Sequence, residues 1–318
     1  MYSIGIDLGG TNIVSSVVDG NYKIIATSKT PTNTPRSADE IFDDIAMITE
    51  EAIKKAGLTK SDIDSIGLGT PGTVNGTGII EFANNLGFNN VPAKQMLIDR
   101  LGINRVYIEN DANCAALGEA YAGVGNGAKD FVAVTLGTGV GSGVIIDGKI
   151  VNGVNYAGGE CGHMVINVGG EQCSCGRKGC WEAYASATAL IRQTKRAMEE
   201  YPDSYMHQIA EAEGKVSGRT AFDAMRKGDV AGIKVVNKYI EYVACGLINL
   251  VNALQPEIIC VGGGICNEGE TLMKPLRNYV QAERYSIHSK IQTKIVKAEL
   301  GNDAGVIGAA ILGKVKED

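Results

Sequence analysis

The feature that most constrains the fold of this chain is a strand, glycine turn and strand pattern that occurs twice. Residues 7–12 (DLGGTN) lead into residues 17–20 (VVDG), and residues 135–140 (TLGTGV) lead at the same spacing into residues 145–148 (IIDG). Each copy has the pattern of a buried strand, a glycine turn, a second strand and an Asp-Gly turn. The duplication predicts two related domains that each open with the same hairpin.

Hydrophobic runs alternate with helical patterns along the rest of the chain. The spacing predicts helices over 38–56, 112–121, 182–200, 230–254 and 304–312, and strands over 2–7, 13–18, 22–27, 65–69, 106–110, 257–261 and 291–297. Ser37 is the expected N-cap of the first helix, with Glu40 completing a capping box. Strands interleaved with helices predict an α/β protein, and 318 residues are enough for two domains.

Composition argues against several classes of protein. The formal net charge is -6 at pH 7, and no run of Lys and Arg has the pattern of a nucleic-acid-binding arm. The first residues lack the basic and apolar regions of a signal peptide, and the longest apolar stretch, 242–254, is too short to span a bilayer. We therefore expect a soluble cytoplasmic protein with no nucleic-acid partner and no membrane partner.

The first glycine turn has the composition of a phosphate-binding loop. Gly9 and Gly10 allow backbone N–H groups to approach phosphate oxygens, because no Cβ stands in the way. Thr11 and Asn12 add side-chain donors, and Asp7 could reach a Mg²⁺ ion through water. These residues predict a site for a nucleotide and its magnesium ion.

Two further glycine runs have a similar character. The copy of the first loop offers a second cradle, made by Gly137, Thr138 and Gly139. A third run follows a predicted strand and consists of Gly262, Gly263 and Gly264. The alternative is that all three are tight hairpin turns, since glycine turns are common. Because two of the loops are copies of each other, we favour a shared ligand.

Asp111 lies where the predicted strand 106–110 meets the predicted helix 112–121. One interpretation is that it caps the helix. The other is that it is a general base that takes the proton from a sugar hydroxyl. Phosphoryl transfer depends mainly on positioning and charge stabilisation, so one well-placed carboxylate is sufficient. The two roles do not exclude each other.

Four potential zinc ligands lie within a short segment of the chain, and they are His163, Cys173, Cys175 and Cys180. Three thiolates and one imidazole fill a tetrahedral shell with no open position, which indicates a structural zinc ion rather than a catalytic one. Reduced structural cysteines are the alternative, and the close spacing of all four ligands disfavours it. Such an ion would hold the segments around Glu160 and Glu182 together.

The chain resembles the ROK family of sugar kinases and sugar-responsive repressors, and most closely its bacterial glucokinases. The resemblance extends from residues 7–11 to residues 304–309, and its most specific part is 158–182, which is similar to the family's G-G-E-x-G-H and C-x-C-G-x-x-G-C-x-E elements. It implies an actin-like ATPase (ribonuclease H-like) fold with a central cleft, and a homodimer or dimer of dimers. The expected domains are a smaller one, 1–112 with 303–318, and a larger one, 113–302, with the zinc site.

The resemblance also implies roles for individual residues. Asp111 would be the base facing the sugar 6-hydroxyl, and ATP would be held by the two hairpin loops and the Gly262 region. The residues that would bind sugar hydroxyls are Asn110, Glu160, His163 and Glu182, with His163 also ligating zinc, and Gly72 and Asn85 at the rim. Phe88 stands where relatives often have Trp, which leaves the preferred sugar open.

The predicted reaction is therefore the ATP-dependent phosphorylation of glucose to glucose 6-phosphate. The alternatives are the same reaction on mannose, fructose or an N-acetylhexosamine, a donor such as polyphosphate or ADP, and a non-catalytic sugar sensor. A further alternative is a DNA-binding, sugar-responsive repressor, which would carry a helix-turn-helix before the first strand. We expect no such segment, because the first predicted strand begins at Tyr2.

Overall fold

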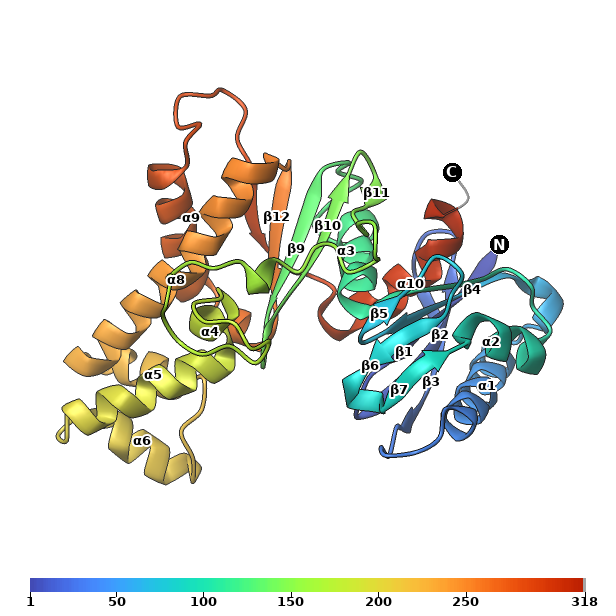
Figure 1. The fold of residues 1–318 in the computed structure, drawn as a ribbon, viewed down its shortest axis with the longest axis horizontal. Helices are drawn as coiled ribbons and strands as arrows, with labels where there is room; N and C mark the ends of the chain where they lie inside the picture. The colour runs from blue at the N-terminus through green and yellow to red at the C-terminus, as the bar shows by residue number, and fades with distance from the viewer. Residues whose placement is uncertain (317–318) are drawn as a thin grey trace. The chain divides into compact units, whose positions relative to one another are not determined.

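The computed structural model describes residues 1–316, which form two compact units (Figure 1). The first unit contains residues Met1–Ala133, Gly143–Gly159 and those from Ala298 onward, and the second contains Val134–Ser142 and Glu160–Lys297. The α/β prediction is confirmed, because strands and helices alternate along the chain. The boundaries of these units differ from the boundaries of the expected domains, at 112 and 303. The expected domain boundaries remain a prediction.

The sheet of the first unit has the strand order β3-β2-β1-β4-β8. Its strands are β1 (Tyr2–Leu8), β2 (Asn12–Asp19), β3 (Ile24–Pro31), β4 (Ile63–Thr70) and β8 (Val106–Asn110). Strands β1, β2 and β3 are antiparallel neighbours, whereas β1, β4 and β8 run parallel. The carboxyl ends of β1, β4 and β8 therefore meet at one edge of the sheet, where ligand sites of α/β proteins occur. Asp7, Gly72 and Asp111 lie at these strand ends.

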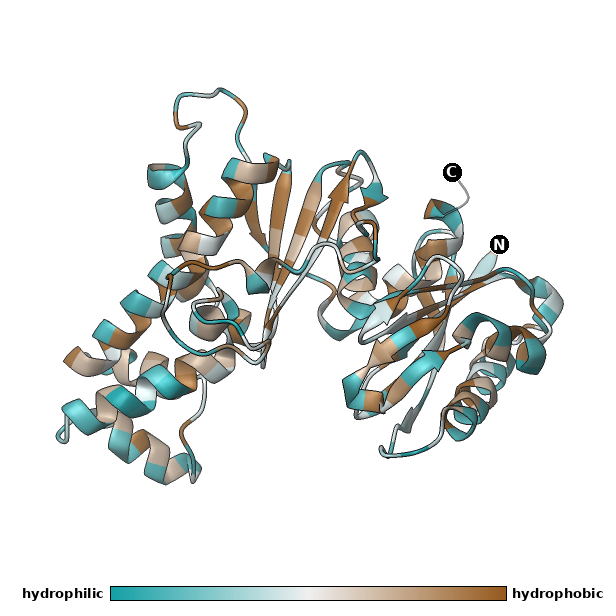
Figure 2. Cartoon of the chain, in the orientation of Figure 1, coloured by the Kyte–Doolittle hydropathy of each residue, from teal (hydrophilic) through white to brown (hydrophobic). Residues whose placement is uncertain are grey.

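A second sheet has the order β11-β10-β9-β12-β13. Its strands are β9 (Phe131–Leu136), β10 (Val140–Ile146), β11 (Lys149–Ile150), β12 (Ile258–Gly262) and β13 (Lys294–Lys297). Counted from β1 and from β9, the two sheets have the same order, and each opens with the hairpin that the internal similarity predicts. Strands β9 and β12 are hydrophobic and almost wholly buried (Figure 2), which is typical of strands covered on both faces. A small third sheet contains β5 (Thr73–Val74), β6 (Ile80–Ala83) and β7 (Phe88–Val91).

Helices cover both faces of the first sheet. They are α1 (Ala38–Lys55), α2 (Ala93–Leu101), α3 (Asp111–Tyr121) and α10 (Ala304–Val315), with short 3₁₀ turns at Lys60–Asp62, Asn84–Leu86 and Gly301–Asp303. The capping box of α1 is present as predicted, with Ser37 Oγ accepting from Glu40 N and Glu40 Oε2 accepting from Ser37 N. Ile4 and Ile6 of β1 share a hydrophobic core with Phe42 of α1.

Glycines on the other face allow α10 to lie directly on the sheet. A Cβ on Gly5 of β1 would come 1.9 Å from the carbonyl oxygen of Val306, and one on Gly67 of β4 would come 1.8 Å from that of Ala309. Real Cβ atoms do not approach so closely, so only glycine permits this packing. Helix α10 also packs on α3. This contact places α3, and with it Asp111, in the first unit.

The second unit contributes the remaining helices. They are α4 (Glu182–Ala185), α5 (Ala187–Glu200), α6 (Tyr205–Glu213), α7 (Thr220–Arg226), α8 (Val230–Leu254) and α9 (Glu270–Glu283), with 3₁₀ turns at Cys161–His163 and Gly264–Glu268. The single helix predicted over 182–200 is interrupted at Ser186, whose extended backbone ends α4 and whose Oγ caps α5 by accepting from Ala189 N at 3.1 Å. Hydrophobic spacing continues through this break, so periodicity did not detect it.

Smaller differences concern the ends of strands. The strand predicted from Tyr22 begins at Ile24, because Tyr22 has a φ of 63° and belongs to the preceding turn. The strand predicted from residue 291 begins at Lys294. Among residues 1–316, no helix combines the length and the hydrophobicity that crossing a membrane requires.

Candidate active site and metal centre

Two carboxyl groups lie at the carboxyl edge of the first sheet. Asp7 precedes the first glycine turn, and Asp111 is the first residue of α3. Burial raises the pKa of Asp111, although a hydrogen bond from Ala112 N to its Oδ1 at 2.8 Å acts in the opposite direction. Burial and the nearby charge of Asp111 raise the pKa of Asp7 to about 6. A carboxylate with a raised pKa is a better proton acceptor than an exposed one, so this pair suits acid-base chemistry.

Asn110, rather than Asp111, is the N-cap of α3. Its Oδ1 accepts from Ala112 N at 2.9 Å and from Asn113 N at 3.3 Å, and its Nδ2 donates to the carbonyl oxygen of Gly72 at 3.1 Å. The capping interpretation of Asp111 is therefore wrong by one residue. The side chain of Asn110 joins the start of α3 to the backbone at Gly72, so two of the predicted sugar-site residues are in direct contact.

The first glycine loop is held by its own sheet. Gly9 N donates to the carbonyl oxygen of Asn12 at 3.0 Å, and Thr32 Oγ1 donates to the carbonyl oxygen of Gly9 at 2.6 Å. A Cβ on Gly10 would lie 3.7 Å from the Cβ of Asn85, which brings this predicted rim residue beside the loop. Gly10, Thr11 and Asn12 are exposed, as a loop that receives a ligand requires.

The second glycine loop is held differently, by the segment 182–188. Ala187 N donates to the carbonyl oxygen of Gly137 at 2.8 Å, and Thr188 Oγ1 donates to that of Thr138 at 2.8 Å. Val140 N, at the end of the loop, donates to Glu182 Oε2 at 3.0 Å.

The third glycine run lies against the start of this second loop. A Cβ on Gly263 would come 2.4 Å from the carbonyl oxygen of Leu136. Gly262 is buried, and Gly263 and Gly264 are exposed. A 3₁₀ turn, Gly264–Glu268, follows this run, and the α-helix begins only at Glu270.

The four predicted zinc ligands come together in the second unit. The ligand atoms of His163, Cys173, Cys175 and Cys180 all lie within 4.8 Å of one another. The sulfurs of Cys175 and Cys180 are 3.7 Å apart, and Cys173 Sγ lies 3.6 Å from His163 Nδ1. Zn–S bonds of about 2.3 Å and Zn–N bonds of about 2.1 Å imply tetrahedral edges of about 3.8 Å and about 3.6 Å. The donor set and its spacing therefore fit a tetrahedral zinc ion.

The predicted sugar residues of the second unit adjoin this cluster. Glu182 Oε1 accepts from Ser174 Oγ at 3.0 Å and lies 3.6 Å from Cys173 Sγ. Glu160 is exposed, and its carbonyl oxygen accepts from His163 N at 3.1 Å. Glu182 and Ser174 thus lie beside the Cys/His cluster through their side chains, and Glu160 adjoins it through its backbone.

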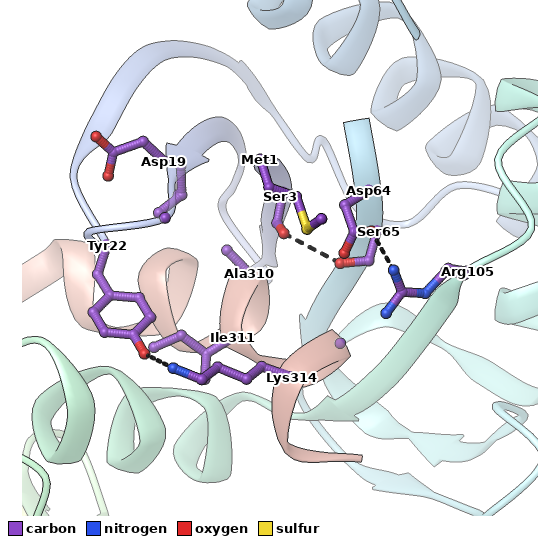
Figure 3. A pocket seen from close by; sticks show the side chains of 13 residues that line it. Met1, Ser3, Asp19, Tyr22, Asp64, Ser65, Arg105, Ala310, Ile311 and Lys314 are labelled. Carbon is purple, nitrogen blue, oxygen red and sulfur yellow. Dashed lines mark hydrogen bonds and ion pairs between the residues drawn. The ribbon is translucent and has the colours of Figure 1, made fainter. Parts of the chain in front are cut away.

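A cavity of about 420 Å³ in the first unit is lined by none of the predicted site residues (Figure 3). Its charged side chains are paired within the wall, because Arg105 forms an ion pair with Asp64 and Lys314 Nζ donates to Tyr22 Oη at 2.5 Å. Asp19 accepts from the backbone N–H groups of its own turn. The cavity therefore offers no group that points to a ligand.

Sequence reasoning missed three hydroxyl side chains that position the site, and they are Thr32, Ser174 and Thr188. Each donates one hydrogen bond, and two of them reach a loop that is distant in sequence. A single threonine or serine carries no pattern that spacing can detect. The only signal was that Thr188 is the second residue of α5, two positions after its N-cap, Ser186.

Comparison with known proteins gives consistent results along the whole chain. The sequence model of the ROK family matches residues 3–316. The glucokinase of Halalkalibacterium halodurans is 37% identical over 99% of this chain and 96% of its own length, and that of Thermotoga maritima is 35% identical over 98% and 96%. The solved structure of a ROK family glucokinase from Streptomyces griseus, in complex with glucose and AMPPNP, is 32% identical, with a TM-score of 0.79 and complete coverage of both chains.

Proposed function

The chain belongs to the ROK family, and from this premise we propose that it is a glucokinase, which transfers the γ-phosphate of ATP to the 6-hydroxyl of glucose. Its fold is the actin-like ATPase fold of the ribonuclease H-like type. The observation that carries the proposal is the pair of half-buried carboxyl groups, Asp7 and Asp111, at the edge of the first sheet beside a glycine loop. Relatives named glucokinase match over nearly their whole length, which favours the enzyme over a regulator.

The proposed reaction uses Asp111 as the general base. Its carboxylate accepts the proton of the 6-hydroxyl as the oxygen attacks the γ-phosphorus, the bond to the bridging oxygen breaks, and ADP leaves. The raised pKa of Asp111 makes it a stronger base than an exposed aspartate, and its fixed place at the start of α3 limits its motion. Asn110 supports this geometry because it caps the same helix.

We assign the nucleotide to the three glycine runs. Gly9, Gly10, Thr11 and Asn12 and the second loop, Gly137, Thr138 and Gly139, would present backbone and side-chain donors to the phosphates. Gly262, Gly263 and Gly264 would lie along the nucleoside. Asp7 would hold Mg²⁺ through water, and the ion would neutralise charge on the transferred phosphoryl group.

We assign the sugar to Asn110, Glu160, His163 and Glu182, with Gly72 and Asn85 at the rim. Carboxylate, imidazole and amide groups can each accept from or donate to a hydroxyl, and a sugar that lacks one hydroxyl leaves a buried polar group unpaired. Zinc, held by His163 Nδ1 and the three thiolates, would act structurally. His163 Nε2, on the other side of the ring, would then face the sugar.

A hexose panel tests the function. Release of ADP is measured with glucose, mannose, fructose and N-acetylhexosamines as acceptors and with ATP, ADP and polyphosphate as donors. We expect the highest kcat/KM for glucose with ATP. Turnover of another hexose with little for glucose would reassign the substrate within the family. No turnover with any of them would contradict the kinase and favour a sugar-responsive regulator.

The zinc assignment has its own measurement. Elemental analysis of purified protein is expected to find about one zinc per chain, because the four ligands form a closed shell. The Cys175→Ser variant should lose the metal, whereas Cys245→Ser, which alters a cysteine outside the cluster, should retain it. Fully active protein without metal would refute the assignment. Cytoplasmic glucose metabolism and assembly as a homodimer or dimer of dimers complete the proposal.

A further inference from the structure

One carboxylate contacts both the metal-binding segment and the second glycine loop. Glu182 is the first residue of α4 and follows the metal ligand Cys180 by two positions. Its Oε1 accepts from the hydroxyl of Ser174, which lies between two of the cysteine ligands, at 3.0 Å. Its Oε2 accepts from Val140 N, at the end of the glycine loop, at 3.0 Å. The side chain therefore bridges two loops that are distant in sequence.

The glycine loop packs tightly on this bridge. A Cβ on Gly139 would come 2.3 Å from Glu182 Oε2, so a larger residue there would displace the carboxylate. The same chain segment also holds two carbonyl groups of the loop, through Ala187 N and Thr188 Oγ1, each at 2.8 Å. Three backbone groups of the loop thus depend on the residues between 182 and 188.

The backbone before Glu182 is firmly anchored. Trp181 is fully buried, and its indole Nε1 donates to the carbonyl oxygen of Tyr242 at 2.8 Å. A Cβ on Gly246 would come 2.0 Å from the indole ring, which shows how closely the ring packs on α8. Because the backbone at Trp181 is fixed, the direction of the Glu182 carboxylate is set by what its two oxygens contact.

We propose that the metal centre positions the second glycine loop through Glu182, so that loss of the metal weakens nucleotide binding and not only sugar binding. The inference rests on the proposed role of residues 137–139 as a nucleotide loop. Without the metal, the segment that carries Ser174 loses its cross-link, and Ser174 no longer restrains the carboxylate. Val140 N then loses a fixed acceptor, and the N–H groups of the loop are no longer held in a single conformation. Thr188 is a second positioning residue that acts on the same loop independently of the metal.

The test measures binding of Mg–AMPPNP by calorimetry, without sugar, to zinc-loaded and to chelator-treated protein. We expect affinity to fall roughly ten-fold when zinc is removed, as for loss of supporting contacts around a metal site. Thr188→Val, which keeps the shape and removes the hydroxyl, should weaken binding by roughly two- to ten-fold, the value of one hydrogen bond. Thr188→Ser should restore it.

Ser174 provides a variant that leaves all four metal ligands in place. Ser174→Ala should weaken binding of both AMPPNP and glucose while zinc content stays at its wild-type level, and Ser174→Thr should rescue both. If chelation unfolds the protein, as circular dichroism would show, Ser174→Ala decides the question. AMPPNP binding that responds to neither zinc removal nor Ser174→Ala overturns the coupling alone. No AMPPNP binding by zinc-loaded wild-type protein overturns the proposed function as well.

Discussion

The two glycine loops are copies in sequence and in topology, but the structure holds them in different ways. The first loop follows β1 and is held by Thr32, just beyond β3 of the same sheet. The second follows β9 and is held by Glu182, Ala187 and Thr188, which belong to helices. At the position of Asp7 in the first copy, the second has Thr135. One copy therefore carries a carboxylate, and the other is connected through Glu182 to the Cys/His cluster.

This difference shows how two copies of one hairpin can support different roles. The first unit holds the half-buried carboxyl groups whose pKa values are raised, and the proposed function assigns them proton transfer and magnesium binding. The second unit holds the Cys/His cluster and the hydrogen bonds that fix loop geometry. In the proposed function, chemistry falls mainly to one copy and positioning to the other, although both copies are built on the same strand order.

The largest expected effect is on turnover, from Asp111→Ala in the first unit. Loss of the general base should lower kcat by roughly 10²- to 10⁴-fold, because no other group accepts the proton of the 6-hydroxyl. Binding of Mg–AMPPNP, measured on the same preparation, should stay close to the wild-type value, since the nucleotide loops are unaltered. Near-normal turnover would show that Asp111 is not the general base. The proposed division of roles between the two units would then be wrong.

A smaller effect is expected from Asp7→Asn on the stability of the protein in the absence of magnesium. The pKa of Asp7 is about 6 in the folded chain and 3.8 in the reference state, so the folded chain binds more protons between these values. Stability therefore falls as pH rises through this window, and ionised Asp7 costs at most about 3 kcal/mol at pH 7. We expect the variant to raise the Tm at pH 7 and to leave it unchanged near pH 3.

The exposed Asp203 supplies the matched control, because Asp203→Asn should leave the Tm unchanged at both pH values. A fall in the Tm of Asp7→Asn at pH 7 would show that the carboxylate stabilises the fold. The charge of Asp7 would then help to fix the geometry of the first loop. The proposed contrast with the second loop, which is held by hydrogen bonds, would no longer hold.

The smallest expected effect is on Mg–AMPPNP affinity, and it compares the two loops directly. Thr32→Val removes the donor to Gly9, as Thr188→Val removes the donor to Thr138, and each should weaken Mg–AMPPNP binding by roughly two- to ten-fold. In Thr32→Val protein, removal of zinc should still weaken binding by the same factor as in wild type, because the hydrogen bonds described for the first loop come from Thr32 and Asn12 of the first unit. If zinc removal weakened Mg–AMPPNP binding by a different factor in Thr32→Val protein, both loops would depend on the metal.

Much of the architecture was predictable from local sequence. The alternation of strands and helices, the capping box at Ser37 and the exact extent of the helix 230–254 follow from hydrophobic spacing and cap residues. The internal similarity predicted two related domains that each open with the same hairpin, and the two observed sheets share one strand order. The break at Ser186 was missed because the hydrophobic pattern continues across it, and the cap of α3 was placed one residue late because Asn and Asp are both good caps.

The sequence by itself determined which groups are available: two glycine hairpins, a carboxylate at a strand end, and four candidate zinc ligands that the fold brings within 4.8 Å of one another. Only the tertiary structure decided what those groups touch. That Glu182 joins Ser174 to Val140, and that Thr188 holds Thr138, depends on contacts between segments far apart in the chain. A hydrogen bond needs its donor and acceptor within about 3 Å. Packing sets that distance, and no spacing along the sequence encodes it.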